Sequence, residues 1–275
     1  MLNNKKIEMS YKRYIKNFTN EHKYERTKQR YLNNLKEVSE LVELNEVEKD
    51  HILLINLGSV FSYQLLNWKN DILLSEGNRS EALKQMYKVV FYQCMSQELY
   101  KTRYPQMMKE YTFNKVVTAL IHFTMFGWEK EEMILYSFIV EHLGGELLDV
   151  NESNKHTWFL LELYLKFRGK VLLGNNHAIS KKVKEMCINN GIENRLIPED
   201  LGIYEEVLTD WATNDTNIIY SLINEMSLYH SLQVSELGQF IEFGDYVYGF
   251  YPYEILFLLH VRKKQGLPNP THFDD

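Results

Sequence analysis

The chain has few of the residues that interrupt helices or cross-link small folds. Its 275 residues include only 5 Pro, 13 Gly and 2 Cys. So few Pro and Gly residues argue against many short strands joined by tight turns, and favour long helices. Cys94 and Cys187 are far apart in the sequence and form no CxxC pair. This spacing argues against a disulfide framework or a structural zinc site and favours a reducing compartment.

Long apolar segments are also missing. No run reaches the roughly 18 apolar residues that a membrane span needs. The first ten residues are polar and lack the apolar centre of a signal peptide. We therefore expect a cytoplasmic protein that does not contact a membrane.

The common catalytic and nucleotide-binding motifs do not occur. The sequence has neither the glycine loops GxGxxG and GxxxxGKS/T nor the hydrolase motifs GxSxG and HExxH. A single ExxH, Glu48 to His51, has no second copy, so a surface turn is favoured over a di-iron site. His260 lies in an apolar run and is interpreted as a neutral core histidine bonded to a carbonyl. We expect no cofactor, no metal and no catalytic residue, so the protein is predicted not to be an enzyme.

Positive charge is concentrated at the start of the chain. Residues 1–35 contain nine Lys or Arg and three Glu, whereas the whole chain has a net charge of −6. These charges alternate with Glu and Asn along a helical pattern. We therefore interpret the segment as a solvated helix face and expect no nucleic-acid partner.

Apolar residues recur at helical spacing through the chain, and no segment shows sustained alternation. The predicted fold is all-α, an irregular multi-helix bundle or stacked helical hairpins with about ten to twelve helices. Helices are expected over 157–173, 199–212, 215–231 and 235–243, with a short extended piece or an aromatic loop over 244–251. No fixed-period repeat supports a regular solenoid. The prediction is a single all-α unit over 1–275, and the polar stretch 146–155 offers a possible division into halves 1–150 and 151–275.

One predicted helix near the end carries clear start and stop signals. Pro252 suits the first helical position, and basic residues at 262–264 fill the last turn. Gly266 suits the left-handed position that follows a helix. The segment between, 255–261, is almost wholly apolar, which is typical of a buried helix. We predict that other helices pack around this one.

The most unusual feature of the charge distribution is a long segment without basic residues. Between Leu196 and Val261 there is no Lys or Arg, although about seven would be expected from the chain average. A surface of one sign repels itself and suits a cationic partner, whereas an incidentally acidic surface is the simpler alternative. The acidic residues of the segment are Glu199, Asp200, Glu205, Glu206, Asp210, Asp215, Glu225, Glu236, Glu242, Asp245 and Glu254.

Aromatic residues gather just before the last predicted helix. Tyr246, Tyr248, Phe250, Tyr251 and Tyr253 could line a pocket, but packing around that helix is the favoured interpretation. The predicted partner-binding residues combine the acidic segment with part of this cluster: Glu199, Asp200, Glu205, Glu206, Asp210, Asp215, Glu242, Asp245, Tyr246 and Tyr248.

The end of the chain resembles a known group of proteins. The order is Trp211-Ala-Thr-Asn-Asp215, a helix to Tyr229-His230, an acidic and aromatic loop, then Tyr251-Pro-Tyr-Glu-Ile-Leu and Arg262-Lys-Lys-Gln-Gly-Leu-Pro268. It resembles the C-terminal part of bacterial immunity proteins of polymorphic toxin systems, of the immunity-protein family forty-nine type. A second similarity is to the immunity proteins of the PoNe nucleases, which have an all-helical build and a similarly placed Tyr-Pro-Tyr. The resemblance covers the chain from Trp211 onward and the rest only as a helical pattern.

The resemblance implies a non-enzymatic protein that binds and blocks a cognate toxin. Many such toxins are nucleases with basic sites, which would suit an acidic surface, and no catalytic residues carry over. The predicted function is therefore neutralisation of a cognate protein toxin by occlusion. The alternatives are a helical-repeat scaffold or peptide-binding regulatory protein with an aromatic groove, and an enzyme with an unrecognised helical active site. A deep pocket holding several carboxylates or His260 would favour the enzyme.

Overall fold

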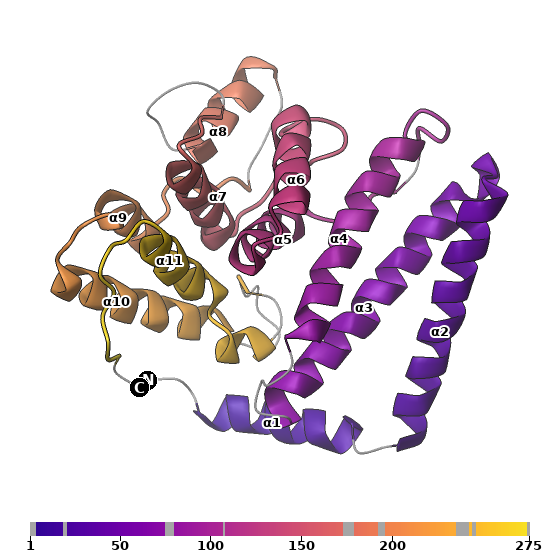
Figure 1. The fold of residues 1–275 in the computed structure, drawn as a ribbon, viewed down its shortest axis with the longest axis horizontal. Helices are drawn as coiled ribbons and strands as arrows, with labels where there is room; N and C mark the ends of the chain where they lie inside the picture. Colours follow the sequence, from indigo (N-terminus) through magenta and orange to yellow (C-terminus); the bar gives the residue numbers. More distant parts are fainter. Residues whose placement is uncertain are drawn as a thin grey trace. The chain divides into compact units, whose positions relative to one another are not determined.

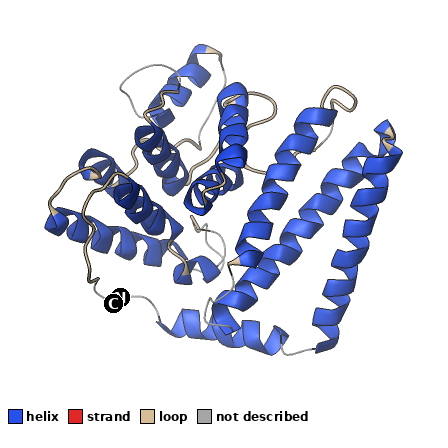
Figure 2. Ribbon diagram, in the orientation of Figure 1, coloured by secondary structure: helices blue, strands red, loops and turns tan. Residues whose placement is uncertain are grey.

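A computed structural model describes residues 4–18, 21–74, 80–106, 108–172, 179–191, 196–234, 242–243 and 246–273. Over these residues the chain forms eleven α-helices, two short 3₁₀ helices and no strand. The prediction of an all-α fold is confirmed, and Figure 2 shows the helices joined by loops. The helices are α1 (Asn4–Phe18), α2 (Glu21–Leu44), η1 (Val47–Lys49), α3 (Asp50–Leu74), α4 (Glu81–Tyr100), α5 (Phe113–Phe126), α6 (Glu129–His142), α7 (Lys155–Arg168), α8 (Ile179–Asn189), α9 (Ile203–Asp210), α10 (Thr216–Val234), η2 (Tyr246–Phe250) and α11 (Tyr253–Lys264).

The chain divides into two compact units. The first, here the α2–α4 unit, consists of Glu8–Ala119 and Met133–Leu148. The second, here the α7–α11 unit, consists of Met1–Ile7, Leu120–Glu132 and Asp149–Asp275. One boundary lies inside the polar stretch 146–155. A division at residue 150 would place Leu120–Glu132 in the first half. In the structure this segment, which covers the end of α5 and the start of α6, belongs to the α7–α11 unit.

Three long helices dominate the α2–α4 unit. In Figure 1, α2, α3 and α4 lie side by side, and α3 contacts both of the others. Apolar residues at helical spacing form a shared core between them, and burying such residues supplies most of the stability of a helix in a protein. The shared core consists of Leu41, Leu53, Leu54, Leu57, Val60, Val89 and Tyr100.

The central helix of the α7–α11 unit is α7. It contacts α8, α9 and α11, and nine of its fourteen residues are buried. The prediction that the other helices pack around the last helix is therefore corrected. On α11, Leu256 is 37% exposed, because that helix covers α7 and α10 with one side and keeps the other at the surface.

The end of α11 follows the sequence signals closely. Gly266 has φ +72° and lies two residues beyond the helix. The N–H of Gly266 donates to the Lys263 carbonyl at 3.1 Å, and the N–H of Leu267 donates to the Arg262 carbonyl at 2.9 Å. These two bonds form a Schellman motif, which pairs carbonyls that a helix end leaves open. Pro252 lies one residue before the helix rather than at its first position.

Two predicted helices are shorter than expected. Gly169, with φ +58°, ends α7 five residues before the predicted stop, since the backbone there turns left-handed. The segment before α9 is a turn in which the Asp200 side chain accepts a hydrogen bond from the Gly202 N–H at 2.8 Å. Such local bonds compete with a helix, so α9 begins only at Ile203.

The aromatic stretch before α11 also differs from its prediction. Residues 246–250 form the 3₁₀ helix η2 rather than an extended piece. Most of the predicted helix over 235–243 lies outside the described residues, and its last two residues form a turn.

Candidate functional site

Most of the predicted acidic residues that the structure describes lie at the surface. The carboxylates of the turn before α9 are exposed, as are those of α9 and of the α9–α10 connection, with Glu205 partly buried. Asp245 lies outside the described residues, as does the side chain of Tyr246. Tyr248 is partly buried. The exposed members are Glu199, Asp200, Glu206, Asp210 and Asp215.

Lysines from other parts of the chain pair with three of these carboxylates. The pairs are Lys155–Asp200 (2.7 Å), Lys184–Glu199 (3.3 Å) and Lys181–Glu205 (3.8 Å). The hydrogen bond and charge of Lys155 lower the pKa of Asp200. The segment without Lys or Arg therefore meets cations from α7 and α8 once the chain folds. Exposed pairs of this kind contribute about 0 to 1 kcal/mol each.

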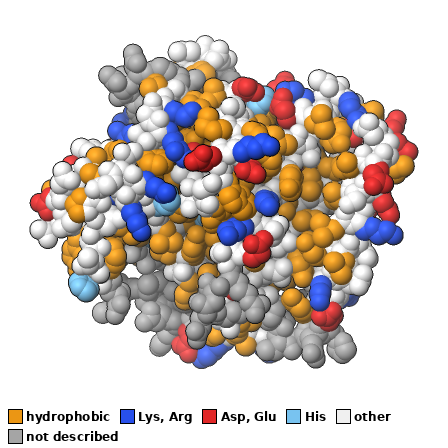
Figure 3. Space-filling model, viewed as in Figure 1, with side chains coloured by type: hydrophobic (Ala, Val, Ile, Leu, Met, Phe, Trp, Pro, Cys, Tyr) orange, Lys and Arg blue, Asp and Glu red, His pale blue; other side chains and the backbone are white. Residues whose placement is uncertain are grey.

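Four exposed carboxylates of this segment are not paired with a cation. Within the described part of the chain, Glu206, Asp210, Asp215 and Glu225 have no ion-pair partner, and α9 and α10 carry no Lys or Arg. Glu206 and Asp210 are four residues apart on α9, where like charges repel each other. On the face drawn in Figure 3, acidic side chains are sparse over α9, α10 and α11 and form no continuous patch. Among the described residues between Leu196 and Val261, the exposed carboxylates without an ion-pair partner are therefore these four.

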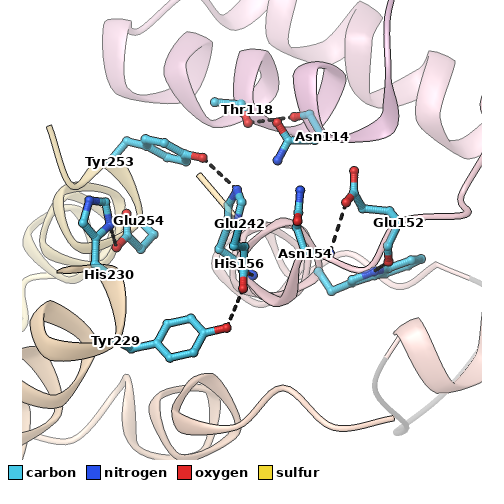
Figure 4. Close-up of polar contacts among 11 residues, drawn as sticks. Asn114, Thr118, Glu152, Asn154, His156, Tyr229, His230, Glu242, Tyr253 and Glu254 are labelled. Carbon is cyan, nitrogen blue, oxygen red and sulfur yellow. Dashed lines mark hydrogen bonds and ion pairs between the residues drawn. The ribbon is translucent and has the colours of Figure 1, made fainter. Parts of the chain in front are cut away.

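Glu242 is not part of an exposed surface, and that prediction is wrong. Its side chain is buried, with 5% exposure, and accepts hydrogen bonds from the backbone N–H and ring Nδ1 of His156 and from the hydroxyl of Tyr229. Burial alone would raise the pKa of Glu242, but the bonds and charge of His156 outweigh burial and lower it. Figure 4 shows Glu242 between these two partners, with Tyr253 on the far side of His156.

The ring of His156 links two helices. Because a carboxylate only accepts, Nδ1 donates to Glu242, and Nε2 lies 2.7 Å from the Tyr253 hydroxyl, within hydrogen-bond distance. His156 belongs to the first turn of α7 and Tyr253 to the first turn of α11. A carboxylate near a helix N-terminus is also favoured by the helix dipole. The network therefore ties the residues before η2 to the starts of α7 and α11.

A second buried histidine pair lies beside the first. His230 Nδ1 is 2.6 Å from Glu254 Oε1, and Nε2 is 2.8 Å from the carbonyl of Tyr248. Both neighbours are acceptors, so both ring nitrogens donate when the ring is an imidazolium. Burial alone would lower the pKa of His230, but the Glu254 carboxylate and the Tyr248 carbonyl outweigh burial and raise it. Glu254 was expected in an acidic segment; it is buried and pairs internally.

Aromatic rings fill the space between these pairs. Phe243 stacks on His156 with centroids 4.3 Å apart and lies 4.1 Å from His230. Tyr251 stacks on His122 at 5.8 Å, and Tyr253 is buried. Tyr251 and Tyr253 therefore pack against other rings within the fold.

Arg262 is the largest departure from the expected chemistry of the last helix. It was predicted as one of three basic residues that fill the last turn of the helix, and its side chain is 0% exposed. The guanidinium donates to the carbonyls of Trp211, Thr213 and Pro268 and to Oδ1 of Asn269. It therefore fastens the α9–α10 connection to the segment after α11, joining two of the motifs that carry the resemblance.

His260 is half-buried on α11, and its pKa is lowered by burial and by the charges of Lys264, Arg168 and Lys263. A neutral ring agrees with the prediction. The buried Nε2 of His260 has no hydrogen-bond partner among the described residues, so the predicted bond to a carbonyl is not made by this atom. Nothing in this environment activates His260 for chemistry.

The described residues offer no obvious metal site or membrane span. No group of three or more His, Cys, Asp or Glu among them is placed to hold a metal ion. No described helix has the length and apolar character to cross a membrane. Cys94 and Cys187 are buried free thiols, and burial raises the pKa of Cys94. A buried thiol whose pKa is raised is a poor nucleophile.

Comparison with known proteins identifies no relative: no family model, curated protein or solved structure matches the chain. The site is therefore interpreted from its own geometry. Sequence reasoning missed the buried pairs of His156 and His230, because their partners lie 86 and 24 residues away. A local signal existed only for Arg262, which follows directly on an apolar run.

Proposed function

We propose that this chain is a binding protein that neutralises a cognate bacterial toxin by covering a basic surface of that toxin. The observation that carries the proposal is the set of exposed carboxylates on α9 and α10, helices that carry no Lys or Arg. Complementary charge accelerates association and discriminates among partners. The toxin would be a basic, nuclease-type protein, as the resemblance implies.

The contact is centred on Glu206 and Asp210. Both side chains are exposed, and neither forms an ion pair with a Lys, Arg or His of the described residues. Bringing Lys or Arg of a toxin to this turn of α9 relieves their mutual repulsion, which adds to the attraction. Glu199, Asp200 and Glu205 contribute less, because a toxin must compete with Lys184, Lys155 and Lys181 for them.

The histidine pairs are assigned to structure rather than to catalysis. His156, Glu242, His230 and Glu254 have the residue types of acid–base chemistry. All four side chains are buried, with their main hydrogen bonds made within the fold. A substrate would have to displace these internal bonds, so a binding function agrees better with the geometry.

The test is protection from a toxin in growing cells. If a large secreted-toxin gene lies directly upstream, its product is the toxin to test, and coexpression of this chain is expected to restore growth. Glu206→Lys/Asp210→Lys is expected to abolish protection and to weaken toxin binding at least tenfold, about 1.4 kcal/mol. The control Glu37→Lys/Glu43→Lys makes the same charge change at exposed positions of α2.

Two results would count against the proposal, and they differ. Lack of protection by the wild-type chain against the neighbouring toxin contradicts the immunity function. Full protection by Glu206→Lys/Asp210→Lys, with a folded protein by circular dichroism, contradicts only the placement of the contact on α9.

A further inference from the structure

A cleft of about 220 Å³ lies between α2 and α3, in the α2–α4 unit and outside the acidic surface. Each helix supplies residues at the i, i+3, i+4 spacing of one helix face. Among the lining residues, α2 contributes Arg30, Tyr31 and Asn34, and α3 contributes Ser59, Ser62 and Tyr63.

The cleft exists because the contact between α2 and α3 is apolar at one end and is formed by small polar side chains at the other. Towards the end of α2, Val38 and Leu41 pack against the apolar core of the unit. Nearer its start, α2 faces Ser59 and Ser62, whose small side chains leave the space between the helices unfilled. A continuous apolar seam would have closed this space, as large interdigitating side chains do elsewhere in the core.

The floor of the cleft is rigid and uncharged. Tyr31 and Tyr63 stack with centroids 4.0 Å apart, and Gln64 donates a hydrogen bond to the Tyr31 hydroxyl at 2.9 Å. Burial raises the pKa of Tyr63 to about 12 and also raises the pKa of Tyr31. Both phenols therefore stay protonated at neutral pH and add no negative charge.

The charge of the cleft is positive and uncompensated. Arg30 is exposed and, within the described residues, has no hydrogen bond or ion pair. The facing helix has no Asp or Glu between Asp50 and Asp71. Asn34 and Ser59 likewise make no hydrogen bond with described residues, whereas Ser62 donates to the carbonyl of Gly58. Three donors thus remain available around one space.

We propose that this cleft binds a small oxyanion, a phosphate or carboxylate group, with Arg30 as its counter-charge and Asn34 and Ser59 as hydrogen-bond donors. A guanidinium matches the planar pair of oxygens that both groups present. The volume equals that of roughly seven water molecules at about 30 Å³ each, which limits the ligand to a small molecule. This site is independent of the proposed toxin contact.

The test is isothermal titration of the full chain with sodium phosphate and, separately, with sodium succinate, at constant ionic strength and with chloride as the reference. Saturable binding of either anion with a dissociation constant below about 1 mM is expected. Phosphate binding alone identifies a phosphate site, and succinate binding alone identifies a carboxylate site. Absence of binding by both overturns the proposal.

Matched variants distinguish the cleft from a general attraction to positive charge. Arg30→Gln is expected to weaken binding at least tenfold, and Ser59→Ala about threefold. Arg26→Gln removes the same charge one helical turn earlier, at an exposed position outside the lining, and should leave binding unchanged. Equal weakening by Arg26→Gln and Arg30→Gln overturns the proposal. Unchanged melting temperatures verify that the variants fold.

Discussion

At the scale of single residues, Arg262 shows how a charge can be buried without an opposite charge. Its guanidinium meets three carbonyls and one side-chain amide oxygen, and no carboxylate pairs with it in the described part of the chain. Backbone carbonyls can satisfy the five N–H donors of arginine because several converge on one plane. Arg262 thereby connects the irregular segment between α9 and α10 to the irregular segment after α11.

Replacing Arg262 with methionine keeps the bulk and removes the donors. We expect Arg262→Met to lower the free energy of unfolding by about 3 kcal/mol, because buried carbonyls lose their partners. Urea denaturation followed by circular dichroism measures the change. Lys263→Met, at an exposed neighbouring position, should change stability by less than about 0.5 kcal/mol. Equal effects of the two substitutions would contradict the role given to Arg262.

The raised pKa of His230 makes stability depend on pH. A group whose pKa is higher in the folded state stabilises fully below its unfolded value, about 6.5 for histidine, and loses that contribution as the pH rises through the folded value. His230→Gln should therefore cost more stability at pH 6 than at pH 9. The charged groups that face the ring are Glu254 and Glu242.

Denaturation at both pH values checks this prediction. His272→Gln, at an exposed position, is the control and should cost the same at both. A cost for His230→Gln that is constant, or larger at pH 9, would show that the ring is not charged in the fold.

At the scale of elements, an ion pair to a buried carboxylate fastens the start of α6 to the end of α7. Arg168 contacts both oxygens of Glu132 at 2.7 and 2.6 Å, and the Tyr164 hydroxyl donates to the same carboxylate at 3.0 Å. Glu132 is 1% exposed. Removing one partner of such a pair leaves a buried charge unpaired, which costs more than removing both.

The buried Glu132 carboxylate predicts an asymmetry between single and double variants. Arg168→Met should destabilise by about 3 kcal/mol, since the buried Glu132 carboxylate loses its cationic partner. Arg168→Met/Glu132→Gln should recover part of that loss, because the charge is gone and the amide can still accept from Tyr164. A double-mutant cycle of unfolding free energies measures the coupling. Purely additive losses would contradict it.

The elements themselves could be predicted well from sequence. Helical periodicity and the stop at Gly266 identified α11, since these signals are local. Helix ends set by a single interaction were less accurate, as with the side chain of Asp200 before α9. The central position of α7 could not be predicted, because an apolar pattern does not state how many neighbours will cover it. The same limit applied to Glu242, whose partner His156 is 86 residues away.

At the scale of the whole molecule, charge in the sequence and charge on the surface differ. The segment without cations gains three lysines from α7 and α8 on folding. The ratio of positive to negative charge at a binding surface therefore depends on the fold. The rate at which a charged partner is attracted over long distances follows the net charge of that folded surface.

Removing those lysines should enlarge the acidic surface. Given the proposed toxin contact, Lys181→Glu/Lys184→Glu is expected to raise the association rate constant about threefold at 0.1 M salt, with little change at 1 M, where the Debye length falls to about 3 Å. Stopped-flow fluorescence measures the rates. Lys36→Glu/Lys49→Glu reverses two paired lysines of the α2–α4 unit and should have no such effect. A rate increase that persists at 1 M salt would contradict electrostatic steering.

The histidine network has a consequence for how the chain folds. His156 contacts Glu242 and Tyr253 across 86 and 97 residues, whereas α2, α3 and α4 pack against helices next to them in sequence. Contacts between distant residues close large loops and form slowly. We therefore expect the α2–α3–α4 contacts to form first. Until the chain closes over His156, the side chains of α7 stay open to solvent and to unwanted partners, so the slowest step of folding covers a helix of which nine residues are buried in the native state.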